Sequence, residues 1–400
     1  QQTYADEQWG QRDFLGSTDE RFRPVDAANG PDGSLYVIDM YRGIIQDDHF
    51  LTEELREQIF QRELDKPIGK GRIWRIRHTE GSQERSAPEL AGAGAAALVA
   101  ALSHSNGWVR DTAQRLLMKF PGEEVAALES LALAADTVPA LHAIWTLQGR
   151  GELSATLVAK ALTKEDAQRQ IHALRAGADV LSAAELVAAA PAFSEASEMA
   201  RMQYAFALGA NADNSDARGQ LVELLASGAD SIYIRQAVVR AASGNELAFL
   251  QELLAANALS AEGEGAVAAL GALAGSAYRS IRPDMTSTET PDAALLALLD
   301  LVEARRGDQT WQQLAMLAGF VPLSRTDSFE PARLEAAPSI FADSSISETD
   351  PLWNARLNAR VSFTWPGDEL ALGIKPLSPE QIALMEKGRE YYPTCANCHG

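Results

Sequence analysis

The segment VRDTAQRLL (residues 109–117) sets a pattern that returns four more times along the chain. The later copies are PALHAIWTL (139–147), RQIHALR (169–175), RMQYAFALG (201–209) and IRQAVVRAA (234–242). They align on Ala113, Ala143, Ala173, Ala205 and Ala237, at intervals of 30, 30, 32 and 32 residues by subtraction. Small residues at the helix contact and a period of about 30–45 residues are typical of stacked HEAT-type hairpins. We therefore predict HEAT-like helical repeats over residues 88–276. An irregular helical bundle is the alternative, because the repeat is degenerate.

Residues 1–80 are the only β-like part of the chain. The turn signal GPDG (30–33) precedes a strand expected over residues 34–40, and residues 69–78 resemble a further strand. Both faces of the first strand are apolar, so we expect both to be covered, as in a blade packed between neighbouring blades. Between the strands, Thr52 is expected to cap a short helix that buries Leu55, Ile59 and Phe60. We predict the terminal part of a β-propeller over residues 1–80.

The remainder of the chain divides into two further segments. Residues 277–377 are predicted to hold a helix pair at 291–307 and 310–320, followed by a Ser- and Asp-rich linker at 339–351. Residues 378–400 begin with SPEQ, a helix start that resembles a capping box, and the helix is expected to run to about residue 390. The fold class is thus predicted as mainly α, with a solenoid between a propeller part and the start of a further domain.

Length and charge narrow the classes of function. A chain of 400 residues is expected to form two or three domains, because single cores stop growing at roughly 250–300 residues. The net charge of -20 argues against a nucleic-acid partner, and we expect no membrane span because no run of about 18 apolar residues occurs. Gln1 at the start and a domain-opening motif at the end indicate a piece of a longer protein.

The last residues carry the most specific chemical signal. In CANCH (395–399), two thiols three positions apart can add to the two vinyl groups of one porphyrin. His399 then lies where its imidazole can bind the iron as the proximal ligand. We therefore predict that Cys395 and Cys398 attach haem c covalently and that His399 is an axial ligand. The alternatives are a dithiol redox site or a zinc site, but no βαβ unit and no second cysteine pair accompanies the motif.

Other residues are weaker candidates. Met385 precedes the motif and is not nominated as the distal ligand; the remaining histidines are expected to be surface or helix-face residues, namely His49, His78, His104, His142 and His172. Asp39, Arg42 and Arg75 could line a substrate face, but we favour a structural hydrogen-bond network for Asp39 and ion pairs for the arginines. Several tryptophans are expected in the core: Trp108, Trp145, Trp311, Trp353 and Trp365.

The order of these segments resembles a family of large secreted bacterial proteins. FRPVDAANGPDGSLYVIDMYRGIIQ, GKGRIWRIR, NGWVRDTAQRLL, FTWPGD and GREYYPTCANCHG carry the resemblance, which covers nearly the whole chain. These membrane-bound dehydrogenase-like proteins join a propeller similar to glucose/sorbosone dehydrogenases to HEAT-like repeats and a C-terminal cytochrome c domain. The resemblance implies oxidation of a sugar or alcohol, with pyrroloquinoline quinone and calcium in the propeller and electrons passed to haem.

Electron transfer by haem c is therefore the predicted function, with a redox partner protein and a sugar or alcohol substrate. A non-catalytic helical scaffold that carries haem as a relay or sensor is the alternative. Because haem attachment needs reduced thiols and haem delivered outside the bacterial cytoplasm, we expect a periplasmic or otherwise exported protein.

Overall fold

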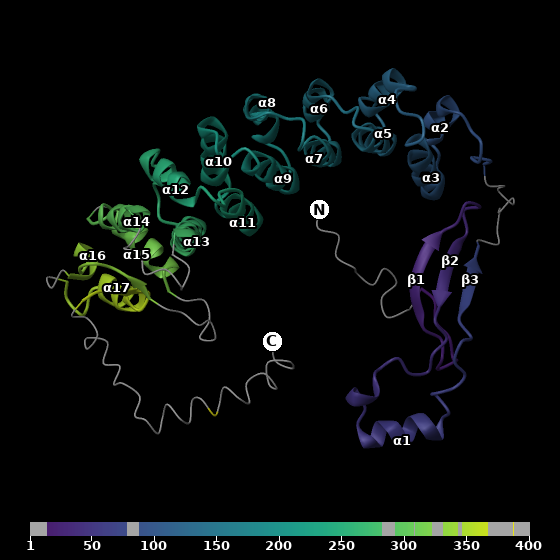
Figure 1. Cartoon of the computed structure of the whole chain (residues 1–400), viewed down its shortest axis with the longest axis horizontal. Coiled ribbons are helices and arrows are strands. Elements are labelled where there is room, and N and C mark those ends of the chain that lie inside the picture. Colours follow the sequence, from purple (N-terminus) through teal and green to yellow (C-terminus); the bar gives the residue numbers. More distant parts are fainter. Residues whose placement is uncertain are drawn as a thin grey trace. The chain divides into compact units, whose positions relative to one another are not determined.

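The structure is a computed structural model that describes residues 14–77, 88–281, 293–307, 309–321, 331–342, 346–366 and 387. Within these residues the protein is mainly helical, with seventeen α-helices and one small three-stranded sheet (Figure 1). The chain separates into two compact units, Gln1–Leu157 and Val158–Gly400. The prediction of a mainly α protein is confirmed. A propeller is not seen in the described residues, which contain one antiparallel sheet of three strands.

The sheet consists of β1 (Pro24–Asn29), β2 (Leu35–Asp39) and β3 (Arg72–Ile76), all antiparallel and in that order. The GPDG turn joins β1 to β2, and Gly33 adopts φ +77°, a left-handed conformation that glycine tolerates at no steric cost. Val37 is buried on one face, whereas Ile38 and Ile73 on the other face are 43% and 70% exposed. No described element covers this second face, so the cover expected on both faces would have to come from outside the described residues.

Helix α1 (Glu53–Gln61) lies between β2 and β3 in the sequence, after a short 3-10 turn, η1 (Asp48–Phe50). Thr52 caps it as predicted, since its hydroxyl accepts a hydrogen bond from Leu55 N at 3.3 Å. Ile59 is buried, but Leu55 and Phe60 are exposed, which corrects the predicted apolar face. Ile59 and Phe60 point about 100° apart, and the contacts that bury Ile59 leave Phe60 exposed.

The first unit continues into helices α2 (Ala95–Ala101), α3 (Gly107–Leu117), α4 (Val125–Ala132) and α5 (Thr137–Gly149). Helix α3 packs against α2 and α5, and α4 packs against α5. Two polar side chains start the helices of the repeated segments here: Asn106 accepts from Trp108 N, and Asp136 accepts from Val138 N. These caps supply partners for backbone N–H groups that have none inside the helix.

Most helices of the second unit are arranged in two layers (Figure 1). One layer holds α7 (Ala167–Ala176), α9 (Glu198–Gly209), α11 (Ile232–Ala241), α13 (Glu264–Ile281) and α15 (Thr310–Gly319), each packed on the next. The other holds α8 (Ala183–Ala188), α10 (Ser215–Gly228), α12 (Glu246–Ala255) and α14 (Ala293–Glu303). Helix α6 (Ala155–Leu162) crosses the boundary between the units, and η2 (Ala190–Phe193) follows α8.

The five aligned alanines mark the contact face of the repeated helices. Their helices are α3, α5, α7, α9 and α11, as the repeat predicts, and all five side chains are buried: Ala113, Ala143, Ala173, Ala205 and Ala237. A methyl group at this position lets neighbouring helices approach closely, which explains why a small residue recurs there.

The second unit ends in an aromatic cluster. Helix α16 (Ser339–Ala342), helix α17 (Pro351–Arg360) and the parallel pair β4 (Ala332–Arg333) and β5 (Phe363–Thr364) surround it. The rings of Tyr278 and Phe363 lie 5.2 Å apart, and Phe341 stacks on Trp365 at 5.9 Å. The predicted linker at 339–351 is therefore wrong at its start, because buried Ile340 and the ring of Phe341 anchor a helical turn.

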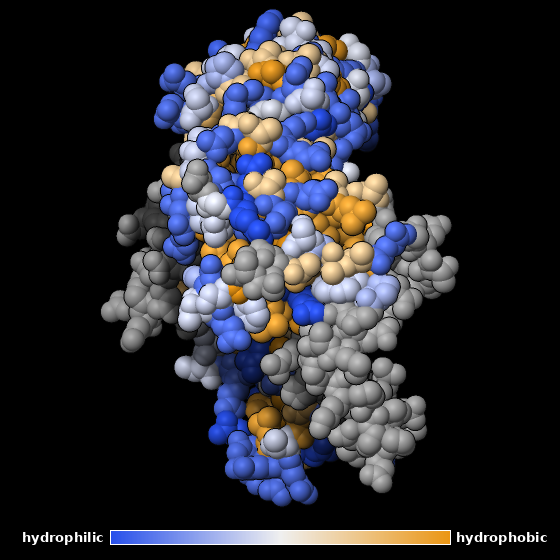
Figure 2. All heavy atoms as spheres, turned by 90° about the vertical axis from the view of Figure 1, so that its left-hand side faces the viewer, coloured by the Kyte–Doolittle hydropathy of each residue, from blue (hydrophilic) through white to orange (hydrophobic). Residues whose placement is uncertain are grey.

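The tryptophans only partly follow the expectation of a core position. Trp365 is buried, Trp145, Trp311 and Trp353 are half-buried, and Trp108 is 37% exposed at the start of α3. Hydrophilic side chains cover much of the face drawn in Figure 2, with hydrophobic atoms gathered in separate patches. Among the described residues, no helix combines the length and apolar character that a membrane crossing needs.

Candidate functional site

The predicted haem site lies outside the described residues. This applies to Cys395, Cys398 and His399, to Met385 and to the predicted helix start at SPEQ. Over the described ranges, no three or more histidine, cysteine, aspartate or glutamate side chains group in a way that could hold a metal ion. The haem site is therefore defined by its sequence alone.

The histidines of the described part lie in separate elements. His49 is exposed in η1 and contacts Asp47 at 2.7 Å, and His104 accepts a hydrogen bond from Asn106 N. His142 lies on α5 and His172 on α7, both half-buried, while His78 lies outside the described residues. The expectation of surface and helix-face positions is confirmed for the four that are described.

His142 is neutral in this environment. Arg110 Nε donates to its Nε2 at 3.3 Å, so Nδ1 carries the proton and donates to Gln114 Oε1 at 2.8 Å. Burial, which opposes charging of the ring, and the Arg110 guanidinium lower the pKa of His142 below its usual value of 6.5, although Asp111 acts in the opposite direction. Burial likewise lowers the pKa of His172, and Arg175 adds to the effect.

Asp39 is the polar centre of the sheet. It is almost fully buried and accepts hydrogen bonds from Arg23 N at 2.9 Å, Tyr41 N at 2.8 Å and Trp74 Nε1 at 3.1 Å. Burial alone would raise the pKa of Asp39, but these three donors, with Arg72 nearby, hold the pKa below 3.8. The structural reading of Asp39 is confirmed, because its carboxylate is occupied by donors from three parts of the sheet.

Arg75 also serves the sheet. Its guanidinium pairs with Asp32 in the β1–β2 turn, and its Nε donates to Ser34 Oγ at 3.1 Å. The Asp32 carboxylate also accepts a hydrogen bond from Ser34 N. This bond outweighs the effect of burial, which alone would raise the pKa, and keeps the pKa of Asp32 below its usual value. Arg42 takes no part in the Asp39 or Asp32 groups, so the structure does not bring Asp39, Arg42 and Arg75 together as one site.

Sequence reasoning missed a second cluster on the sheet. The Arg72 guanidinium lies over the Tyr41 ring, 3.6 Å from its centroid, and the Tyr41 hydroxyl donates to Asp19 Oδ2 at 2.9 Å. Tyr41 has φ +50°, which is unusual for a residue with a side chain. The Asp39 carboxylate and the cation–π contact hold it there. The partners come from widely separated positions, so only the folded chain reveals this cluster.

Three arginines share one geometry in the helical part. In each, Nη1 donates to two backbone carbonyls that lie six and five residues earlier, in the turn before its own helix. These residues are Arg110, Arg218 and Arg235, and each follows the N-cap of its helix by four residues. A guanidinium fork suits such paired acceptors. The common spacing from the cap could have revealed this feature in the sequence.

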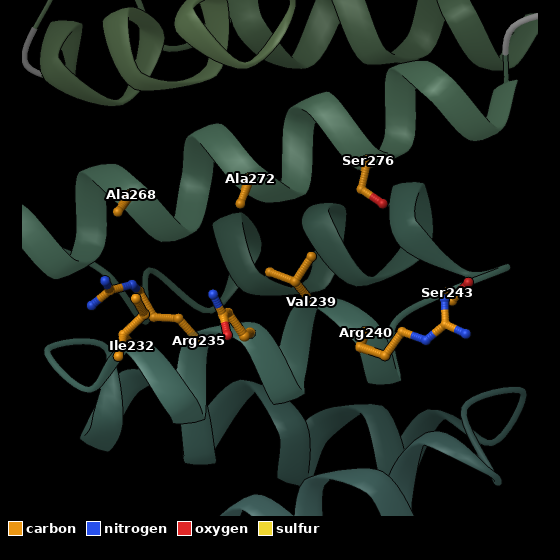
Figure 3. A pocket seen from close by; sticks show the side chains of 9 residues that line it. Ile232, Arg235, Val239, Arg240, Ser243, Ala268, Ala272 and Ser276 are labelled. Atoms are coloured by element: carbon orange, nitrogen blue, oxygen red, sulfur yellow. The ribbon is translucent and has the colours of Figure 1, made fainter. Parts of the chain in front are cut away.

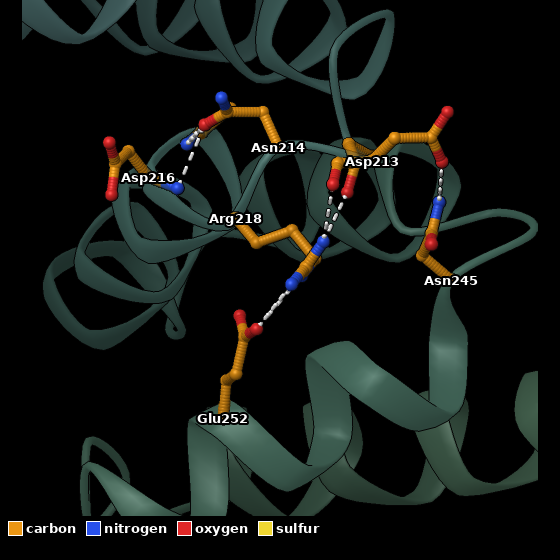
Figure 4. A network of polar contacts seen from close by, with 8 residues as sticks. Asp213, Asn214, Asp216, Arg218, Asn245 and Glu252 are labelled. Atoms are coloured by element: carbon orange, nitrogen blue, oxygen red, sulfur yellow. Dashed lines mark hydrogen bonds and ion pairs between the residues drawn. The ribbon is translucent and has the colours of Figure 1, made fainter.

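Around Arg218 this geometry becomes a network between α10 and α12 (Figure 4). Its Nη2 pairs with Glu252 Oε1 at 2.6 Å, and its Nη1 holds the carbonyls of Ala212 and Asp213 at 2.8 and 3.1 Å. Asn245 Nδ2 donates to Asp213 Oδ1 at 3.1 Å. The network joins the α9–α10 turn to the next helical pair.

Two of the open hollows in the second unit lie among its layered helices. One, of about 510 Å³, lies where η2, α9 and α10 meet and includes Glu195, Arg201 and Glu223. The other, of about 390 Å³, lies between α11 and α13 (Figure 3). We call it the α11/α13 groove; its lining consists of Ile232, Arg235, Gln236, Val239, Arg240, Ser243, Ala268, Ala272 and Ser276.

Comparison with known proteins identifies one family model. Residues 1–80 match a domain of unknown function, DUF7133, which spans the sheet and α1. No curated protein and no solved structure matches the chain.

Proposed function

We propose that this chain binds haem c and transfers electrons, as the C-terminal part of a propeller-containing sugar or alcohol dehydrogenase. The observation that carries the proposal is CANCH at 395–399, which combines two thiols at the attachment spacing with an adjacent imidazole. The donor set fits haem: Cys395 and Cys398 would form the thioether bonds, and His399 would bind the iron. When bound, the haem would supply reversible one-electron chemistry.

The other parts of the chain are consistent with supporting roles. The helical pairs with buried alanines at intervals of 30–32 residues suit a HEAT-like spacer between a propeller and a cytochrome domain. The uncovered face of the three-stranded sheet suits a blade that further blades would cover. Pyrroloquinoline quinone and calcium are assigned to no residue of this chain.

Covalent haem attachment also bears on location and partners. The thiols must be reduced when haem is delivered outside the bacterial cytoplasm, so we assign the chain to the periplasm or another exported location. A redox partner protein would then take the electrons. The net charge of -20 argues against a nucleic-acid partner.

The test is expression of the chain with export and haem-maturation machinery. We expect haem that survives denaturation and a mass increase of one macrocycle, both lost when Cys395 and Cys398 are changed to Ser. His399→Ala should retain the attached haem but change its axial-ligand spectrum, and Asn397→Ala is the control that leaves both unchanged. Bound zinc without a Soret band would contradict the proposal.

A second candidate is an interaction scaffold, favoured by one observation: the α11/α13 groove is a preformed hollow on the helical part. Substrate-dependent reduction of the haem in the full-length protein separates the two. A dehydrogenase reduces its haem when a sugar or alcohol is added, whereas a scaffold does not.

A further inference from the structure

The α11/α13 groove results from a mismatch in side-chain size. Residues 232, 235, 236, 239 and 240 of α11 line one side of the groove, and residue 243 follows in the turn after the helix. The facing stripe of α13 carries only small side chains, those of Ala268, Ala272 and Ser276 (Figure 3). These side chains are too short to fill the space against α11, so a hollow of about 390 Å³ remains open.

The neighbouring contacts in the same layer are closed. Between α9 and α11, a Cβ built on Gly209 would lie 2.7 Å from Ala241 Cα. Between α13 and α15, a Cβ on Gly319 would lie 2.1 Å from the Gly271 carbonyl oxygen. Glycines thus bring these helices into backbone contact on either side, and the groove is a local departure from the packing of its own layer.

The groove is positively charged within an acidic chain. Arg235 and Arg240 line it, and none of its lining residues is acidic, although the chain carries a net charge of -20. Arg240 is exposed, and among the described residues no hydrogen bond or ion pair engages its guanidinium group. The Glu246 carboxylate lies behind Ser276, at 3.5 Å from its hydroxyl, and does not line the groove.

The two guanidinium groups point toward opposite ends of the groove (Figure 3). Arg235 and Arg240 lie five residues apart, so their side chains leave α11 about 140° apart around its axis. In an extended peptide, side chains two residues apart lie on one side at about 6.6–7 Å. An extended acidic segment that runs along the groove therefore presents carboxylates at intervals, so that separate carboxylates can meet the two guanidinium groups.

We propose that the α11/α13 groove binds an extended acidic segment of a partner protein, with separate carboxylates paired to Arg235 and Arg240. The groove volume is at the small end for ligand pockets and suits a few extended residues rather than a helix of about 10–12 Å diameter. Gln236, Ser243 and Ser276 supply hydrogen bonds, and Val239 and Ala272 contact the peptide between its carboxylates.

The test uses a fluorescein-labelled octapeptide of alternating aspartate and serine, with an asparagine–serine peptide as the uncharged comparison. We expect anisotropy to report binding of the aspartate peptide that weakens as salt is added. The asparagine peptide should bind at least about tenfold more weakly, because charge-assisted hydrogen bonds are lost.

Variants connect this binding to the groove. Arg240→Gln should weaken binding at least about tenfold, because the pair with one carboxylate is lost. Ala272→Leu should also weaken it by filling the hollow, whereas Arg175→Gln, an exposed arginine on α7 with the same change in charge, should leave it unchanged. Arg235 is left intact because it holds the α10–α11 turn.

Equal binding of the two peptides, or equal loss in Arg240→Gln and Arg175→Gln, would overturn the proposal. So would occupation of the groove by a second copy, seen as self-association that Ala272→Leu abolishes. Circular dichroism of each variant checks the fold. The measurement does not involve haem, so its outcome is independent of the proposed electron transfer.

Discussion

Replacing Arg218 by alanine tests which of its contacts stabilise the helical part. Arg218 makes two kinds of contact: an ion pair with Glu252 and hydrogen bonds to the carbonyls of Ala212 and Asp213. Glu252 is 35% exposed, so water can hydrate its carboxylate after the arginine is removed. The carbonyl bonds instead secure the turn that leads from α9 into α10. We therefore expect the turn contacts to dominate.

The magnitude follows from these contacts. Two hydrogen bonds to the turn carbonyls contribute about 1 kcal/mol each, and a partly exposed ion pair contributes at most about 1 kcal/mol. Arg218→Ala should thus cost about 2–3 kcal/mol, while Glu252→Gln should cost less than about 1 kcal/mol. Arg218→Lys should recover little, because an ammonium group cannot reach both carbonyls and the carboxylate in the geometry of the guanidinium fork.

Hydrogen exchange followed by mass spectrometry is the suitable assay, because it reports local opening in a chain of two units. In the peptides that cover the α9–α10 turn and α10, Arg218→Ala should speed exchange by about 30- to 150-fold, the equivalent of 2–3 kcal/mol. Glu252→Gln should change it by less than about fivefold at low salt and by less still at 1 M salt.

A different ranking would refute this reasoning. If Glu252→Gln accelerates exchange as much as Arg218→Ala, the ion pair carries the stabilisation and the turn carbonyls do not. If the effect of Arg218→Ala spreads evenly over α7 to α15, the residue supports the whole unit rather than one turn.

Three further changes probe other parts of the fold. Asp39→Ala should destabilise the sheet by about 3 kcal/mol, because three partly buried donors each lose a hydrogen bond of about 1 kcal/mol, and urea unfolding followed by tryptophan fluorescence should show it. Because the pKa of His142 is lowered in the folded chain, the unfolded chain binds more protons, and the stability present above pH 6.5 falls as the pH drops. His142→Gln should make this fall smaller, which thermal melts at pH 7 and pH 5 measure. Gly319→Ala should lower the melting temperature because its Cβ would meet the Gly271 carbonyl, whereas Gly219→Ala, with open space around it, should raise the melting temperature slightly.

Much of the helical part can be predicted from local sequence. The alanine period places five helices correctly, because a small residue at a fixed interval reports a repeated helix contact. Thr52 identifies the start of α1, since a cap acts on N–H groups two or three residues away. The haem proposal is local in the same sense: attachment chemistry needs two thiols and an imidazole within five residues, and no distant partner enters the pattern.

The tertiary structure alone decided the remaining features. Asp39 finds donors on Arg23 and Trp74 because strand pairing brings residues 16 and 35 positions away beside it. The α11/α13 groove depends on the side-chain sizes of two helices some 30 residues apart. The uncovered face of the sheet is a further example. The apolar residues at 34–40 predict a strand, but they do not specify which element covers that strand. Periodicity and capping act over a few residues of chain, whereas burial, ion pairing and hollows depend on distances in space that no short stretch of sequence contains.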